Sequence, residues 1–340
     1  KDQVAALGFD YESIADFANS AMWYEKLFNL DAKHESSPDA LYSSALFRRA
    51  MGEWQVAIKN YEKYISAYPD KENVEEIKLE IAKIYEANEK YSEASKVFQR
   101  FYKDADKDTP IAQIFYARLR YGLALKSMEQ TSALDKHWAD CVKEINKIPA
   151  GTELGEGVEV IAQILYEVAE AEYTKYAAKQ IDGPGSQQLG RKALDKLLLK
   201  QLTEKAQALQ AMELTYANII NTGAGEWGLA ALVRVGQAYE NMAESLENSY
   251  IPSYLTEDQV EFYRMALEDK IYPQQEKAVE AYTRALEKSF ELSLYNENTA
   301  YATRRLGELR PDDFPGLEEG LLDPGYVSTQ SFDADFETEL

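Results

Sequence analysis

Apolar residues recur along the chain at the three- and four-residue spacing of an amphipathic α-helix. Ile77, Ile81 and Ile84 follow this spacing, whereas few segments show the two-residue alternation of a half-buried strand. Glycine and proline cluster where the apolar periodicity stops. These stops are Pro38, Pro69, Pro110, Pro149, DGPGS (182–186), NTGAGEWG (221–228), Pro252, Pro273 and RPDDFPG (310–316). The pattern predicts an all-α protein built from antiparallel helical hairpins.

One helical pattern occurs twice. The first copy consists of Trp54, Ala57, Tyr61 and Tyr64. The second copy, 37 positions further along, consists of Tyr91, Ala94, Phe98 and Phe101. Small residues in the preceding helices, Ala45 and Ala82, let the two helices of each pair approach closely. The large rings are expected to fill the space between successive hairpins, so they are interpreted as core.

These landmarks resemble the tetratricopeptide repeat (TPR), a helical hairpin of about 34 residues. The resemblance is specific over residues 39–106. It returns near the C-terminal end, with Gly236 and Tyr239 in one helix and Ala278, Tyr282 and Ala285 in the next. It implies an alpha-alpha superhelix, or solenoid, of TPR-like hairpins, in which no hairpin buries its apolar face alone.

The predicted organisation has four parts. They are TPR-like hairpins over residues 1–150, a long degenerate helical hairpin over 151–225, a TPR-like repeat over 226–310 with an insertion at 248–273, and an acidic non-helical tail over 311–340. FDYESIADFANSAMWYEKLF (9–28) resembles a second helix with too few residues before it for a good first helix. This predicts a fragment of a larger protein. Aligning Pro149 with Pro69 places His137 at the position of Ala57 and Cys141 at that of Tyr61.

The net charge of the chain limits the classes of partner that it can bind. Lys and Arg total 37 against 59 Asp and Glu, giving a formal net charge of −22, which opposes binding to nucleic acid or anionic membranes. No apolar run reaches the roughly 18 residues of a transmembrane helix. The predicted partners are protein subunits or peptides, without nucleic acid and without direct membrane insertion, and the oligomeric state is left open.

Candidate chemistry is sparse. His137 and Cys141 are spaced four apart on one predicted helix face, which suits a metal half-site or a Cys-His nucleophile. No third ligand or orienting acid is indicated, so the favoured interpretation is a buried cysteine beside a partly exposed histidine. DGPGS and TGAGEWG follow no strand and lack the Lys and Ser or Thr of a Walker loop. SFDADFETEL lacks the central Gly and the final Glu of a calcium loop. The sequence therefore predicts no catalytic residue, cofactor or metal, and a protein that is not an enzyme.

The TPR resemblance implies a ligand-binding face on the first helices of successive hairpins. The positions carried over are Tyr42, Leu46, Arg49, Leu79, Lys83, Glu86, Val233, Gln237 and Glu240. Four aromatic residues are predicted to anchor the tail, namely Phe314, Tyr326, Phe332 and Phe336. Its proximal part, 314–326, is expected to cap the last hairpin, and its distal part, 330–340, to bind a partner.

The segment 250–315, YIPSYL to DDFP, is similar to the last repeat of cell-envelope TPR proteins of predatory and gliding bacteria. That group includes periplasmic scaffold proteins of the gliding-motility apparatus. The similarity implies a non-catalytic scaffold in the periplasm or cell envelope, for example a subunit of gliding-motility machinery. The alternatives are an outer-membrane assembly factor and, less favoured, the helical framework of a peptidoglycan-processing enzyme.

Overall fold

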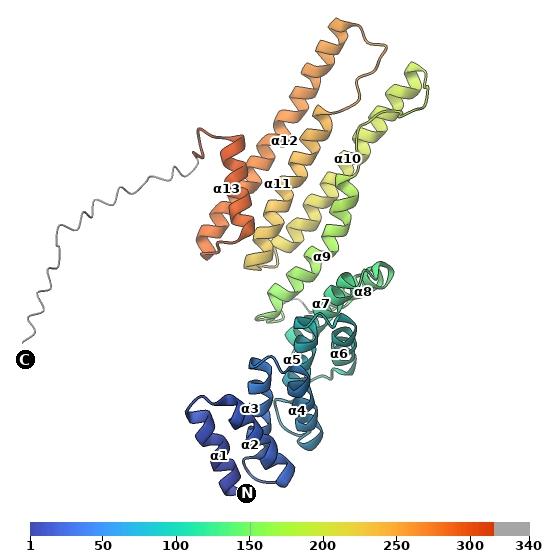
Figure 1. The fold of residues 1–340 in the computed structure, drawn as a ribbon. Helices are drawn as coiled ribbons and strands as arrows, with labels where there is room; N and C mark the ends of the chain where they lie inside the picture. Colours follow the sequence, from blue (N-terminus) through green and yellow to red (C-terminus); the bar gives the residue numbers. More distant parts are fainter. Residues whose placement is uncertain (150, 316–340) are drawn as a thin grey trace, which may run out of the picture. The chain divides into compact units, whose positions relative to one another are not determined.

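The structure is a computed structural model that describes residues 1–149 and 151–315. In these two ranges the chain forms thirteen α-helices and no β-strand (Figure 1). The helices are α1 (Asp2–Ser13), α2 (Phe17–Leu30), α3 (Ser37–Ala50), α4 (Trp54–Ala67), α5 (Val74–Ala87), α6 (Tyr91–Asp104), α7 (Ile111–Ser127), α8 (Thr131–Ile145), α9 (Gly157–Ala177), α10 (Arg191–Ile220), α11 (Gly225–Glu247), α12 (Glu257–Leu292) and α13 (Glu297–Leu309). The predicted all-α class is confirmed.

The contacts of the chain divide it into two compact units. Unit 1 consists of Lys1–Ala178 and Ala211–Ala231. Unit 2 consists of Lys179–Gln210 and the described residues from Leu232 onward. Helices α10 and α11 each supply residues to both units.

The first four helix pairs of unit 1 share one turn. Three residues join the helices of each pair, and the middle residue has a left-handed backbone at Ala15, Gly52, Glu89 and Glu129, with φ between 56° and 80°. The next residue donates its backbone N–H to the carbonyl five positions back, as Lys90 does to Tyr85 at 2.9 Å. This bond closes the end of the first helix and turns the chain back on itself. The four pairs α1/α2, α3/α4, α5/α6 and α7/α8 are therefore copies of one hairpin.

Each copy also pairs a small residue on its first helix with a large ring on its second. The four pairs are Gly8 with Tyr24, Ala45 with Tyr61, Ala82 with Phe98, and Gly122 with Trp138. A Cβ atom added at Gly8 or at Gly122 would overlap the facing ring. Ala45 and Tyr61 are fully buried in one core cluster, as are Ala82 and Phe98 in the next. Close approach of the two helices is thus a property of every hairpin.

The prediction that residues 9–28 form a second helix without a first is wrong. That stretch contains a break, because α1 ends at Ser13 and α2 begins at Phe17. The break lacks Gly and Pro, since the left-handed residue is Ala15. Its one sequence signal is Asp16, whose side chain accepts a bond from the backbone N–H of Asn19 at 3.2 Å and so caps α2.

The alignment of His137 with Ala57 is also wrong. Helix α7 has 17 residues where α3 and α5 have 14, so the fourth turn residue follows the third after 40 positions instead of 37. The turns place Leu134 at the position of Ala57 and Trp138 at that of Tyr61. The small residue that faces Trp138 is Gly122, which gives no helical signal in the sequence.

Unit 2 repeats the small-to-large contact on longer helices. Three ring atoms of Tyr282 in α12 lie within 2.8 Å of a Cβ added at Gly236 in α11, and α13 packs on α12. Pro273 does not end a helix as predicted but lies inside α12. The carbonyl of Asp269 loses its usual N–H partner there, and both residues are exposed, so water can replace the lost bond.

The described chain ends just after α13. The backbone N–H of Phe314 donates to the carbonyl of Arg310 at 2.9 Å, and the Phe314 ring is half-buried. The other predicted anchors, Tyr326, Phe332 and Phe336, lie outside the described residues, so the proposed roles of the tail stay predictions.

Candidate protein-interaction face

The positions carried over from the TPR resemblance divide by burial. Leu79 and Val233 are 5% and 3% exposed. These two residues pack in the interior, which corrects their assignment to a ligand-binding face. Tyr42 is half-buried against the core cluster of α3 and α4, and Leu46 is 37% exposed.

Two charged positions of this set in unit 1, Arg49 and Glu86, form ion pairs with the neighbouring first helix. Arg49 in α3 lies 2.5 Å from Glu80 in α5, and Glu86 in α5 accepts from Nε of Arg120 in α7 at 2.8 Å. Lys126 in α7 continues the series, 2.8 Å from Glu167 in α9. Arg49, Glu86 and Lys126 each lie three residues before the left-handed turn residue of their hairpin. The same position in three successive hairpins therefore forms an ion pair with the next first helix, and its own charge is positive, then negative, then positive.

Unit 2 contains the equivalent pair. Glu240 lies four residues after Gly236, as Arg49 lies four after Ala45. Its carboxylate accepts from Nε of Arg305 in α13 at 3.0 Å and from the Tyr282 hydroxyl at 2.6 Å. Gln237, also carried over, accepts from Arg234 one helical turn earlier at 2.5 Å. Partly exposed pairs of this kind are each worth about 0–1 kcal/mol, so they contribute little to the stability of the fold.

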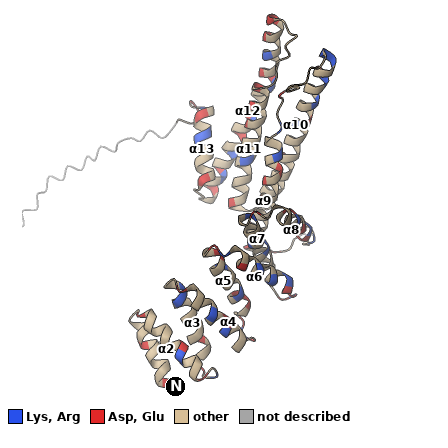
Figure 2. Cartoon of the chain, turned by 45° about the vertical axis from the view of Figure 1, so that its right-hand side comes forward, with Lys and Arg blue, Asp and Glu red and all other residues tan. Residues whose placement is uncertain are grey.

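The first-helix face of unit 1 is defined here as Tyr42, Leu46, Arg49, Lys83, Glu86 and Tyr116. Lys83 lies 2.6 Å from Glu80 and 5.5 Å from the centroid of the Tyr116 ring. Burial raises the pKa of Tyr42 and of Tyr116, and the nearby carboxylates add to the effect at Tyr42. Both hydroxyls stay protonated at neutral pH and can donate hydrogen bonds. Basic and acidic residues are both scattered over the helices (Figure 2). The first-helix face itself presents aromatic, aliphatic and mixed-charge side chains.

His137 and Cys141 meet inside the fourth hairpin. Cys141 Sγ lies 3.3 Å from His137 Nε2, which also lies 2.8 Å from the carbonyl oxygen of Arg118. The histidine is 6% exposed, contrary to the expected partial exposure. Burial raises the pKa of the Cys141 thiol to about 11 and lowers the pKa of His137. A protonated thiol is a poor nucleophile and a poor metal ligand. Within the described chain, no group of three His, Cys, Asp or Glu side chains has the geometry to hold a metal ion.

The two glycine-rich loops have packing roles. Gly183, with φ of +72°, lies against the Tyr250 ring, and its backbone N–H donates to the side-chain oxygen of Gln201 at 3.2 Å. At the start of α11, the backbone N–H of Gly225 donates to the Glu159 carboxylate at 2.6 Å. A carboxylate of the chain itself thus occupies the place at this helix N-terminus where a phosphate would bind.

Comparisons with known proteins add a fold likeness. No protein-family model matches the sequence, and no curated protein matches it. Among solved structures, a tetratricopeptide repeat protein from Parabacteroides merdae is similar with a TM-score of 0.35 and 12% identity, over 91% of this chain and 97% of that one. A structure from a functional characterization of Pseudomonas aeruginosa pilF is similar with a TM-score of 0.33 and 14% identity, over 83% of this chain and 96% of that one. At these scores the likeness carries no argument about function, and the assignment to stacked helical hairpins stands on the helix pairs themselves.

None of the helices in the described ranges has the length and apolar character needed to cross a bilayer.

Proposed function

We propose that the chain is a non-catalytic protein-interaction scaffold and that the first-helix face of unit 1 contacts a partner protein. The observation that carries the proposal is the repeated ion pairing of Arg49 with Glu80 and of Glu86 with Arg120. These pairs join successive first helices at the surface, and the buried core clusters beneath them hold the helices in place before a partner binds. Preorganisation lowers the ordering cost of binding.

The chemistry of this face indicates the kind of partner. Exposed Leu46 and half-buried Tyr42 and Tyr116 offer apolar contact and hydroxyl donors, a combination enriched at the centres of protein interfaces. Lys83 and Arg49 are each engaged by Glu80, so the face has no cluster of free cations to clamp a C-terminal carboxylate. The favoured partner is a protein surface or an internal peptide segment.

The proposed setting is the periplasm or cell envelope of a bacterium, as a subunit of an assembly such as gliding-motility machinery. The support for this setting is the similarity of residues 250–315 to envelope TPR scaffolds. The location and the binding activity can be tested separately, because cell fractionation tests the location and partner capture tests the binding.

The test is to purify the full chain from cross-linked cell fractions and to identify the proteins that are bound to it. The expected result is one or a few partners recovered in stoichiometric amount, with Leu46→Asp losing them and Met22→Asp keeping them. Met22 on α2 is a matched control, since it is 45% exposed against 37% for Leu46. Equal recovery by both variants would remove the first-helix face from the proposal.

A further inference from the structure

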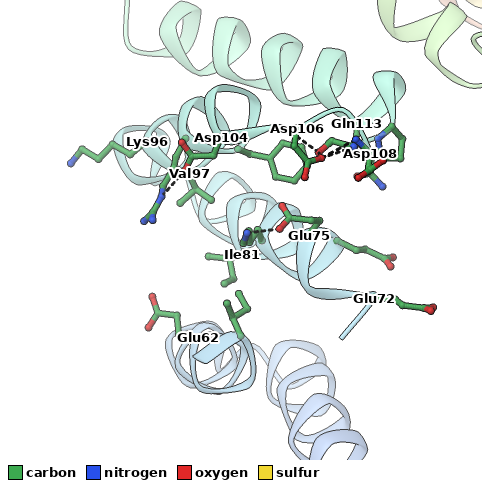
Figure 3. A pocket seen from close by; sticks show the side chains of 17 residues that line it. Glu62, Glu72, Glu75, Ile81, Lys96, Val97, Asp104, Asp106, Asp108 and Gln113 are labelled. Atoms are coloured by element: carbon green, nitrogen blue, oxygen red, sulfur yellow. Dashed lines mark hydrogen bonds and ion pairs between the residues drawn. The ribbon is translucent and has the colours of Figure 1, made fainter. Parts of the chain in front are cut away.

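A groove on the opposite helices of the same repeats has a different character. It has a volume of about 740 Å³ and lies between the second helices α4 and α6, with α5 at its base. Figure 3 shows Glu62 on one side, Val97 and Asp104 on the other, and Ile81 between them. This size falls within the usual range of ligand-binding clefts, about 300–1,000 Å³.

The floor of the groove is apolar and fixed. Ile81 and Phe101 are 6% and 5% exposed and belong to two neighbouring core clusters. Ile65 and Val97 are half-buried beside them. An apolar side chain that enters the groove would therefore meet packed hydrocarbon without any rearrangement of the hairpins.

The rim of the groove is acidic. Seven lining residues are Asp or Glu and three are Lys or Arg. Two of the three bases are already neutralised, Lys78 by Glu75 at 2.5 Å and Arg100 by Asp104 at 3.2 Å. The other five acids of the groove form no ion pair with any described residue, and they are Glu62, Glu72, Glu76, Asp106 and Asp108.

The acidity belongs to this groove and is not a general consequence of the repeat. A neighbouring pocket formed by α4 and Phe28 of α2 has Lys59 and Lys63 against Glu62 as its charged residues. Residues 316–340 of the chain contain no Lys or Arg, so like charge disfavours them as an occupant. A cationic segment from another protein fits both the rim and the floor.

We infer that this acidic groove is a second docking site, which takes a segment of a partner protein carrying an apolar side chain flanked by Lys or Arg. The inference rests on the proposed scaffold function and adds to it a separate surface with its own ligand chemistry. The apolar side chain packs on Ile81 and Val97, and the flanking cations pair with carboxylates of α4, of the start of α5 and of the loop before α7.

The test measures the binding of three labelled peptides to the full chain by fluorescence anisotropy. The first has leucines flanked by lysines, the second has serine in place of leucine, and the third has glutamate in place of lysine. The first should bind, and the other two should bind at least about tenfold more weakly, because each lacks one half of the recognition.

Matched variants separate the groove from the overall negative charge. Glu62→Gln, Glu72→Gln and Asp108→Asn together should weaken the first peptide about tenfold. Glu35→Gln, Glu153→Gln and Asp135→Asn, which remove the same charge from exposed sites outside the groove, should change binding less than about twofold.

Equal losses in the two triple variants, or equal binding of the serine peptide, would overturn the inference. Either result would leave the scaffold function standing if Leu46→Asp still loses partners in the capture experiment. All six substituted side chains are exposed, so both triple variants are expected to fold, which circular dichroism verifies.

Discussion

The contact between Gly236 and Tyr282 predicts that Gly→Ala substitutions at two positions of helix α11 change the free energy of unfolding in opposite directions. Replacing Gly by Ala inside a helix normally stabilises by about 1 kcal/mol. At Gly236 the new methyl group would meet three ring atoms within 2.8 Å. The ring is fully buried, and its hydroxyl is held by Glu240 at 2.6 Å, so it has little room to move. With an overpacking cost of about 1–3 kcal/mol and further loss from the hydroxyl bond, Gly236→Ala should lower the free energy of unfolding by about 1–2 kcal/mol.

Gly228, in the first turn of the same helix, is the matched control. A Cβ there meets its nearest heavy atom outside the local helix at 4.0 Å, so Gly228→Ala should raise the free energy of unfolding by up to about 1 kcal/mol. Urea denaturation followed by circular dichroism measures both variants. In a Tyr282→Leu background the cost of Gly236→Ala should largely disappear, because the obstructing ring atoms are gone. Stabilisation by Gly236→Ala in the wild-type background would refute close packing of α11 on α12.

Three further outcomes follow from the described contacts. Ala94→Leu, at a fully buried position of α6, should destabilise by about 1–3 kcal/mol, whereas Ala87→Leu, on the exposed end of α5, should not, as melting midpoints will show. Burial lowers the pKa of Lys205 to about 8 from 10.5. Between pH 8 and pH 10.5 the amine of Lys205 is neutral in the folded chain and takes up a proton on unfolding. The free energy of unfolding, relative to that of Lys205→Met, should therefore rise by about 1.4 kcal/mol per pH unit from pH 8 to 10. A difference between the two proteins that does not change with pH across that range would contradict the burial of this amine. The Cys141 thiol, with a pKa of about 11, should react with iodoacetamide far more slowly in the native chain than in urea; equal rates would show that it is accessible.

The hairpin pattern was predictable where the residue types contrast. Ala45 and Ala57 among large aromatic residues mark a close helix crossing, and the second copy confirms the period. The same crossing at Gly8 and Gly122 was missed, because glycine has poor helix propensity and indicates loops as readily as contacts. The turn residues Ala15, Glu89 and Glu129 adopt a left-handed backbone without being glycine. The regular spacing of the turns could therefore not be recognised from the residue types.

The inter-repeat ion pairs were hidden for a different reason. Arg49, Glu86 and Lys126 occupy one structural position with alternating charge, so a search for repeated residue types passes over them. Their partners lie on the next first helix at varying sequence distance. The acidic groove likewise gathers residues from α4, α5, α6 and the loop before α7, and only the stacking of the hairpins brings Glu62 and Asp108 to one opening.

The measurement that tests the scaffold function most directly is site-specific photo-cross-linking in cells of the source organism. A photoreactive amino acid replaces Leu46 on the first-helix face or, as a control, Met22 on α2; both side chains are exposed. The prediction is a discrete covalent adduct to a partner protein from position 46 and none from position 22. No adduct from position 46, or identical adducts from both positions, would contradict a partner-binding role for the first-helix face.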